Sequence, residues 1–260
     1  RFAPQDMPES TRNLRRFLWL PALFCRGFFS LRLFRHMLVL HGNAVGGGSV
    51  VYANTLLVPP EKVWRSGTWA LLRDWAAEMP EHYRTAEKML GVTTNPLLAD
   101  ADYMLKKLAD EAGVGGSFYR TRVAVYFGAD DEHAQPQQQG DPYFAGKGPA
   151  RAPCIGCGGC MVGCRHRAKN SLDYNYLYLA EKLGVKVLAE SRVSHIEPLD
   201  KQDKGHTGWR VTVKPFKQPE QHFTAQNVIV SAGSLGTQAL LFDMKEKGVL
   251  PELSPALGRN

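Results

Sequence analysis

The sequence lacks several features by which a protein class is most readily identified. No stretch of about 18 apolar residues is free of charge, so we expect no transmembrane helix. It also contains no G-x-x-x-x-G-K-S/T phosphate loop, no G-x-G-x-x-G dinucleotide fingerprint and no G-x-S-x-G nucleophile elbow. These absences exclude the simplest signatures of P-loop enzymes, of a self-contained Rossmann nucleotide site and of serine hydrolases.

The most apolar region, residues 17–40, is interrupted by Arg26, Arg32 and Arg35. We interpret it as a buried helix followed by a strand, and peripheral contact with a membrane surface is the alternative. The net charge of the chain is +7, but no basic stripe is interleaved with aromatic residues. Nucleic-acid binding proteins concentrate their positive charge on one face, so we expect no nucleic-acid partner.

The chain begins at Arg1, shows no signal-peptide pattern and stops at Gly258-Arg259-Asn260. We interpret it as an internal fragment of a longer protein. Four of its five cysteines lie within eleven residues, which is not the arrangement of a disulfide framework. Clustered thiols favour a reducing compartment, and we expect a cytoplasmic location.

Those four cysteines have the spacing C-x2-C-x2-C-x3-C, and they are Cys154, Cys157, Cys160 and Cys164. This is the spacing of a ferredoxin motif, in which thiolates hold a [4Fe–4S] cluster. Arg165 stands where such motifs usually have proline. Three interpretations stay open: an iron–sulfur cluster, a zinc ion held by C-x2-C pairs, and reduced thiols packed under a loop without a metal.

Two other segments have the composition of ligand-binding turns. Gly46, Gly47, Gly48 and Ser49 lie between apolar runs at 36–40 and 50–58, which we predict to be strands. Consecutive glycines let a backbone approach a ligand closely, and their N–H groups can bind an anion; a flexible turn is the alternative. Residues 223–230 are predicted to form a strand, and the continuous apolar run 228–230 at its end is typical of a strand buried on both faces. Small residues then lead into a helix that begins near Thr237.

Helical periodicity covers much of residues 67–113 and also 172–183, whereas 128–153 is polar and rich in glycine and proline. Further strands are expected at 185–193 and 209–214. This order of elements predicts an α/β fold with an added antiparallel layer.

Several segments, in this order, resemble the glucose–methanol–choline oxidoreductases, particularly their cholesterol oxidase-like branch. The run from Val45 to Asn54 looks like the flavin-contact loop of that family. Ala168-Lys-Asn-Ser-Leu-Asp173, continuing through Tyr176–Ala180, is similar to the family's helix before a cofactor-domain strand. Glu190-Ser-Arg-Val193 and Val230-Ser-Ala-Gly233 match two further family positions. The resemblance extends from about residue 35 to 241.

The resemblance implies FAD as cofactor and hydride transfer from an alcohol carbon to the flavin. It implies backbone contacts from Gly46, Gly47, Gly48 and Ser49 to the flavin or pyrophosphate, and places Tyr52 and Asn54 near the isoalloxazine. It implies that Val193 meets the adenine, and that the adenosine side is lined by Ala232, Gly233 and Ser234. The histidine base of the family normally lies beyond residue 260, so no catalytic residue is assigned.

These observations together predict an α/β chain with a partial Rossmann-like FAD-binding domain, a β-hairpin layer and part of a substrate domain. We expect FAD-binding segments at 1–62 and 151–241, a helical excursion toward the substrate at 63–150, and the start of a further region at 242–260. The predicted function is oxidation of the CH–OH group of an apolar alcohol, such as a sterol or fatty alcohol, with the electron acceptor left open. An iron–sulfur electron-transfer module, or a subunit combining flavin and cluster, is the alternative.

Overall fold

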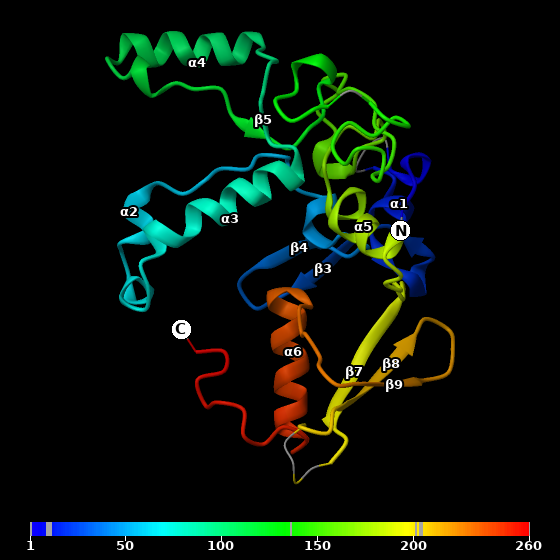
Figure 1. Ribbon diagram of the computed structural model, residues 1–260. Coiled ribbons are helices and arrows are strands. Elements are labelled where there is room, and N and C mark those ends of the chain that lie inside the picture. The colour runs from blue at the N-terminus through cyan, green and yellow to red at the C-terminus, as the bar shows by residue number, and fades with distance from the viewer. Residues whose placement is uncertain (1, 9–11, 136, 201, 203–204, 260) are drawn as a thin grey trace. The chain divides into compact units, whose positions relative to one another are not determined.

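The computed structural model describes residues 2–8, 12–135, 137–200, 202 and 205–259 (Figure 1). The chain divides into two compact units, Arg1–Lys186 and Val187–Asn260, and each is described by itself. No helix in the described part of the chain is long and apolar enough to cross a membrane.

The first unit combines helices with three small antiparallel two-stranded sheets, β1–β2, β3–β4 and β5–β6. Its helices are α1 Leu14–Phe17, α2 Glu61–Trp64, α3 Trp75–Leu90, α4 Asp100–Glu111 and α5 Tyr176–Lys182. Its strands are β1 Trp19–Leu20, β2 Cys25–Arg26, β3 Phe29–Leu33, β4 Leu38–Gly42, β5 Thr93–Thr94 and β6 Arg122–Val123.

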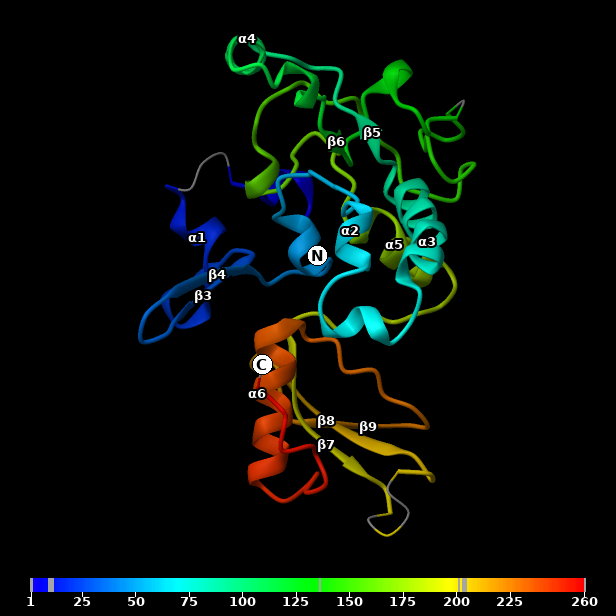
Figure 2. The ribbon, with the colours of Figure 1, turned by 90° about the vertical axis from the view of Figure 1, so that its left-hand side faces the viewer.

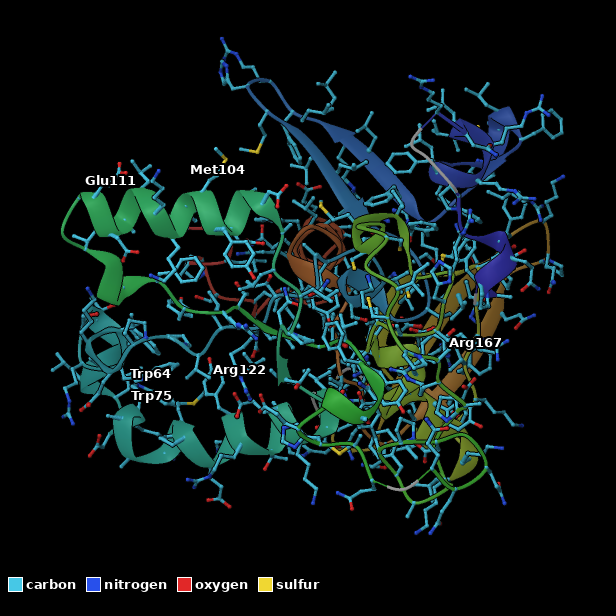
Figure 3. The ribbon with its side chains drawn as sticks, turned by 90° about the horizontal axis from the view of Figure 1, so that it is seen from above. Trp64, Trp75, Met104, Glu111, Arg122 and Arg167 are labelled. Carbon is cyan, nitrogen blue, oxygen red and sulfur yellow. The ribbon has the colours of Figure 1, made fainter. Side chains whose placement is uncertain are left out.

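Helix α3 has clear signals at both of its ends. The Asp74 side chain accepts a hydrogen bond from the Ala77 N–H at 3.3 Å, and Gly91 ends the helix in a left-handed conformation with φ of 55°. Trp64 and Trp75 lie at the same end of α3 (Figure 3). Both contact Trp69: the ring centroid of Trp69 is 5.8 Å from that of Trp64 and 5.9 Å from that of Trp75. The cluster holds α2 against α3.

Two small apolar cores stabilise the part of the first unit that carries the candidate site. Phe28 and Phe29 pack with Val50 in one core, so the start of the β3–β4 hairpin is anchored to the segment after the glycines. Val123, Val125 and Ala168 form the second core, against which Cys154 and Cys164 pack. The cysteine segment is therefore fixed to β6 at its base.

The second unit is a three-stranded antiparallel sheet with one helix. Its elements are β7 Ser191–Pro198, β8 Trp209–Pro215, β9 Gln221–Ala225 and α6 Gly233–Glu246. Strand β8 lies in the centre, with Val213 opposite Val193 on β7 and opposite Gln221 on β9. Both Figure 1 and Figure 2 show α6 beside this sheet, where it contacts β7.

The mixed α/β class and the predicted helices at 67–113 and 172–183 are confirmed by α3, α4 and α5, and the strand at 209–214 by β8. The strand predicted at 223–230 is confirmed only in its first part, by β9; residues 228–230 lie outside any strand, and Ile229 is 89% exposed. A buried strand needs a hydrogen-bonded neighbour on each side, and this run has none among the described residues.

Three other strand or helix predictions differ from the structure. Residues 17–40 form two short hairpins, β1–β2 and β3–β4, rather than a buried helix followed by a strand, although β4 corresponds to the strand expected at 36–40. Phe28 and Phe29 are buried here, whereas Leu31, Leu33 and Leu38 are exposed. Residues 50–58 are turns and extended loop, and the strand expected at 185–193 begins only at Ser191. Residues 50–58 and 185–190 have the apolar composition of a strand but lie outside the strands, because composition alone does not supply a paired neighbour.

Glu132 joins β5 to β6. Its carboxylate accepts hydrogen bonds from the Thr94 N–H at 2.7 Å and from Arg122, which is labelled in Figure 3, at 2.6 Å. Burial alone would raise the pKa of Glu132, but the bonds from Thr94 and Arg122 outweigh it and lower the pKa to about 2.

We therefore predict that Glu132→Gln destabilises the protein at pH 7 by roughly 0.5–1 kcal/mol, a value reduced by solvent screening. A carboxylate whose pKa is lower in the folded state contributes stability above its unfolded pKa of about 4.3 and loses it as the pH falls toward 2. Urea unfolding of both proteins should show the difference shrinking across that range. A difference that is constant from pH 7 to pH 2.5 would contradict the assignment.

Candidate functional site

The three glycines follow β4: Gly46 precedes a short 3-10 helix, Gly47–Val50, and the other two begin it. Gly46 and Gly47 have φ of 108° and 56°, a conformation that side chains other than glycine adopt at a cost. A Cβ added at Gly47 or at Gly48 would meet no atom within 4 Å. The backbone at these two positions therefore faces open space, as a loop that receives a ligand requires.

Ser49 and Asp173 fix the inner side of this turn. The Ser49 hydroxyl donates to the Gly46 carbonyl at 2.6 Å and accepts the Leu172 N–H at 2.9 Å. A Cβ on Gly46 would lie 3.2 Å from the Asp173 carboxylate, which also accepts a hydrogen bond from Ser171 at 2.6 Å. The Ser49 hydroxyl is thus used within the fold, and so are two backbone donors of the turn: the Ser49 N–H donates to the Gly46 carbonyl at 3.3 Å and the Gly47 N–H to the Ala44 carbonyl at 2.8 Å.

Lys169 links the glycine turn to the cysteine segment. Its side chain is buried, and its ammonium group donates to the carbonyls of Val50 at 2.7 Å, Tyr52 at 3.1 Å and Cys160 at 2.7 Å. Burial lowers the pKa of Lys169 to about 8, although neighbouring Cys160, Cys164 and Asp173 act in the opposite direction. One amine thus satisfies three carbonyls from two loops that are more than a hundred residues apart.

Tyr52 and Asn54 lie where these two loops meet. The Tyr52 hydroxyl donates to the Asn170 carbonyl at 2.7 Å, and the Lys169 ammonium lies 4.9 Å from the centre of the Tyr52 ring. Burial raises the pKa of the Tyr52 phenol, and Cys160 raises it further. Asn54 has φ of 62°, which orients its amide to donate to the Cys160 sulfur at 2.9 Å.

The four clustered cysteines line one small cavity of about 20 Å³, together with Lys169. All four are reduced; Cys157 is exposed and the other three are half-buried. Backbone N–H groups also donate to two of the sulfurs: Gly156 to Cys154 at 3.4 Å, and Ala168 to Cys164 at 3.4 Å. Burial raises the pKa of the Cys154 thiol, the Gly156 N–H lowers it, and the other three cysteines raise it again.

Within the described residues, no three His, Cys, Asp or Glu side chains converge closely enough to hold a metal ion as they stand. The sulfurs surround a space rather than meeting at one point.

The remaining candidates belong to the second unit. Val193 lies on β7 at a β-bulge, and its side chain is 37% exposed. Ala232, Gly233 and Ser234 form the exposed N-terminus of the fourteen-residue helix α6, where a Cβ on Gly233 would meet no atom within 4 Å. The N-terminus of a helix favours anions. Structurally, these residues are accessible to a ligand.

Sequence reasoning missed the two buried cations of this region. Besides Lys169, Arg151 is only 8% exposed; it donates to the Lys169 carbonyl at 3.3 Å and lies over the Tyr174 ring at 4.7 Å. Lysine and arginine are usually exposed, so the sequence alone predicts a surface position for both. Neither residue belongs to a pattern that would indicate burial. The adjoining polar run Asn170-Ser171 was the only signal that this segment is a network rather than a surface.

We predict that Lys169→Met destabilises the protein by about 2–4 kcal/mol, because it leaves three carbonyls in low-dielectric surroundings without a donor. The measurement is urea unfolding followed by far-UV circular dichroism. Lys107→Met is the matched control: its side chain is 80% exposed and should change stability by less than about 0.5 kcal/mol. Equal, small effects of the two substitutions would refute the bracing role of Lys169.

The sequence is similar to those of known proteins. Residues 151–260 match the family described as GMC oxidoreductase. The chain is 48% identical to a cholesterol oxidase of Acinetobacter baumannii and 43% identical to a cholesterol oxidase of Mycobacterium tuberculosis, with 99% of the chain aligned in both cases. It spans under half the length of these relatives, 47% and 44%. The chain belongs to the GMC oxidoreductase family.

Proposed function

We propose that the protein is an FAD-dependent oxidoreductase that oxidises the CH–OH group of a sterol-like alcohol. The observation that carries this proposal is the open backbone at Gly47 and Gly48, held in place by Ser49 and Lys169. The family supports a flavin cofactor, and the names of the relatives support a sterol as the class of substrate. The electron acceptor is not part of the proposal.

The described residues fit a flavin nucleotide in two respects. The turn Gly46–Ser49 leaves open space over Gly47 and Gly48, where a backbone without Cβ atoms lets an extended ligand approach closely. In the second unit, the exposed N-terminus of α6 at Ala232–Ser234 suits a phosphate or ribose. We assign Tyr52 and Asn54 to the isoalloxazine side and Val193 to the adenine. Residues 1–62 and 151–241 would form the FAD-binding part, Rossmann-like in its full context, and 63–150 the part toward the substrate.

Once bound, the flavin would supply the chemistry by accepting a hydride from the alcohol carbon. The residues of this chain bind and orient it. The network of Lys169 and Ser49 keeps the turn from collapsing, and a preformed turn reduces the ordering cost of binding. The half-buried Tyr52 ring, tied through its hydroxyl to Asn170, is held in one orientation.

The cofactor loop can be tested without disturbing the fold. In the full-length protein, Gly48→Val should lower bound flavin at least about tenfold, since the new side chain fills the space of the ligand. Gly116→Val is the matched control, because a Cβ at Gly116 likewise meets nothing within 4 Å. The measurement is the flavin released on denaturation per mole of protein, with the melting temperature of each apoprotein. Normal flavin content in Gly48→Val would refute the assignment.

The reaction can be tested on the flavin itself. Adding a 3-hydroxysterol to the anaerobic full-length protein should bleach its flavin absorption near roughly 450 nm, since the hydride comes from the substrate. The matched 3-ketosterol, which has no hydride to give at that carbon, should leave the spectrum unchanged. Bleaching by neither sterol, with bleaching by a short alcohol, would contradict a sterol-like substrate.

A further inference from the structure

We propose that Cys154, Cys157, Cys160 and Cys164 are the ligands of an iron–sulfur cluster that lies beside the glycine turn. The argument rests on the geometry of the cysteine cavity and on the charges buried around it, and it stands whether or not the turn holds a flavin.

All four sulfurs belong to one site. In a ferredoxin with two clusters, the fourth cysteine of such a run serves the other cluster. Here Cys164 lines the same cavity as the other three and packs against Val125 beside Cys154. The segment is closed at its base by Tyr126, whose carbonyl accepts the Cys154 N–H at 2.8 Å and whose N–H donates to Ala168 at 2.9 Å.

The arrangement suits a cluster better than a single ion. A zinc ion needs four sulfurs converging at about 2.3 Å from one point, and among the residues with described positions there is no such convergence. In a cluster each thiolate binds a different iron, so the sulfurs surround the ligand. The present cavity of about 20 Å³ holds little more than one water, so the loop must open to admit a cluster.

The loop is built to open at its tip. Gly156, Gly158 and Gly163 all have positive φ, and a Cβ on Gly158 would meet no atom within 4 Å. Ile155 and Met161 are 66% and 59% exposed, so little apolar packing holds the tip down. At the base, by contrast, Tyr126 is bonded to Cys154 and to Ala168, so the base of the loop is held more firmly than its tip.

The surroundings are charged for an anionic ligand. Lys169 and Arg151 are both buried next to the site, and Asp173 is the buried carboxylate that interacts electrostatically with both. The Arg151 Nε and Nη1 atoms have no hydrogen-bond partner among the described residues. A cluster held by four thiolates carries net negative charge and would balance this excess, whereas four neutral thiols would not.

Hydrogen bonds to the sulfurs are the remaining feature. Asn54, Gly156 and Ala168 donate to Cys160, Cys154 and Cys164 respectively. Such bonds stabilise thiolates and raise the reduction potential of a cluster. The Asn54 bond also places the site directly against the segment that follows the glycine turn.

The test is chemical analysis of the full-length protein purified without oxygen, before and after incubation with ferrous iron and sulfide. We expect about four iron and four acid-labile sulfide per chain, and an electron paramagnetic resonance signal after reduction with dithionite. Cys157→Ala should lose at least about half of the iron. Because Cys157 is exposed, the melting temperature of this variant should match that of the unchanged protein. Cys25→Ala, at a cysteine outside the cavity, should keep all of it.

Zinc in place of iron, no metal after incubation, or full iron retention in Cys157→Ala would each overturn the proposal. Flavin is measured on the same samples, so protein with flavin and no iron refutes the cluster alone, and protein with iron and no flavin refutes only the proposed function. In addition, Asn54→Gly removes the amide that donates to the Cys160 sulfur, and glycine tolerates the positive φ at this position. This variant should lower the reduction potential of the cluster. An unchanged reduction potential would overturn Cys160 as a ligand.

Discussion

A single buried ammonium group determines how the candidate site is assembled. Lys169 is 2% exposed and binds carbonyls from Val50, Tyr52 and Cys160, so it ties the segment after the glycine turn to the cysteine loop. Burying a lysine costs several kcal/mol unless its donors are satisfied, and here all three are. Without this group, the three carbonyls would lack a donor in a poorly solvated space, and the hydrogen bonds that join the two loops through Lys169 would be lost.

Two functional elements depend on this arrangement. The glycine turn stays open because its inner side is bonded to Ser49 and the 171–173 segment, leaving Gly47 and Gly48 uncovered. The cysteine loop meets the same lysine through the Cys160 carbonyl and meets Asn54 through the Cys160 sulfur. The proposed flavin site and the proposed cluster site are thus joined by a shared set of hydrogen bonds, which is the structural condition for two redox groups to influence each other.

Local patterns in the sequence predicted local structure well. The helical periodicity over 67–113 predicted α3 and α4, the strand expected at 209–214 is β8, and the cysteine and glycine spacings lead directly to the candidate site. Predictions failed where the outcome depends on distant partners. The apolar run 228–230 has the composition of a buried strand, but pairing decides whether a strand forms. Lys169 and Arg151 could not be identified, since no local pattern distinguishes a buried cation from an exposed one.

The central claim, that the braced turn receives the cofactor, is tested most directly by hydrogen–deuterium exchange of the full-length apoprotein with and without FAD. The account predicts that FAD slows amide exchange at Gly46–Ser49 in the first unit, and at Val193 and Ala232–Ser234 in the second. The 100–111 segment of α4, whose apolar side chains such as Met104 are exposed, should be unchanged (Figure 3). Saturating FAD that leaves exchange at Gly46–Ser49 unaltered would contradict the account.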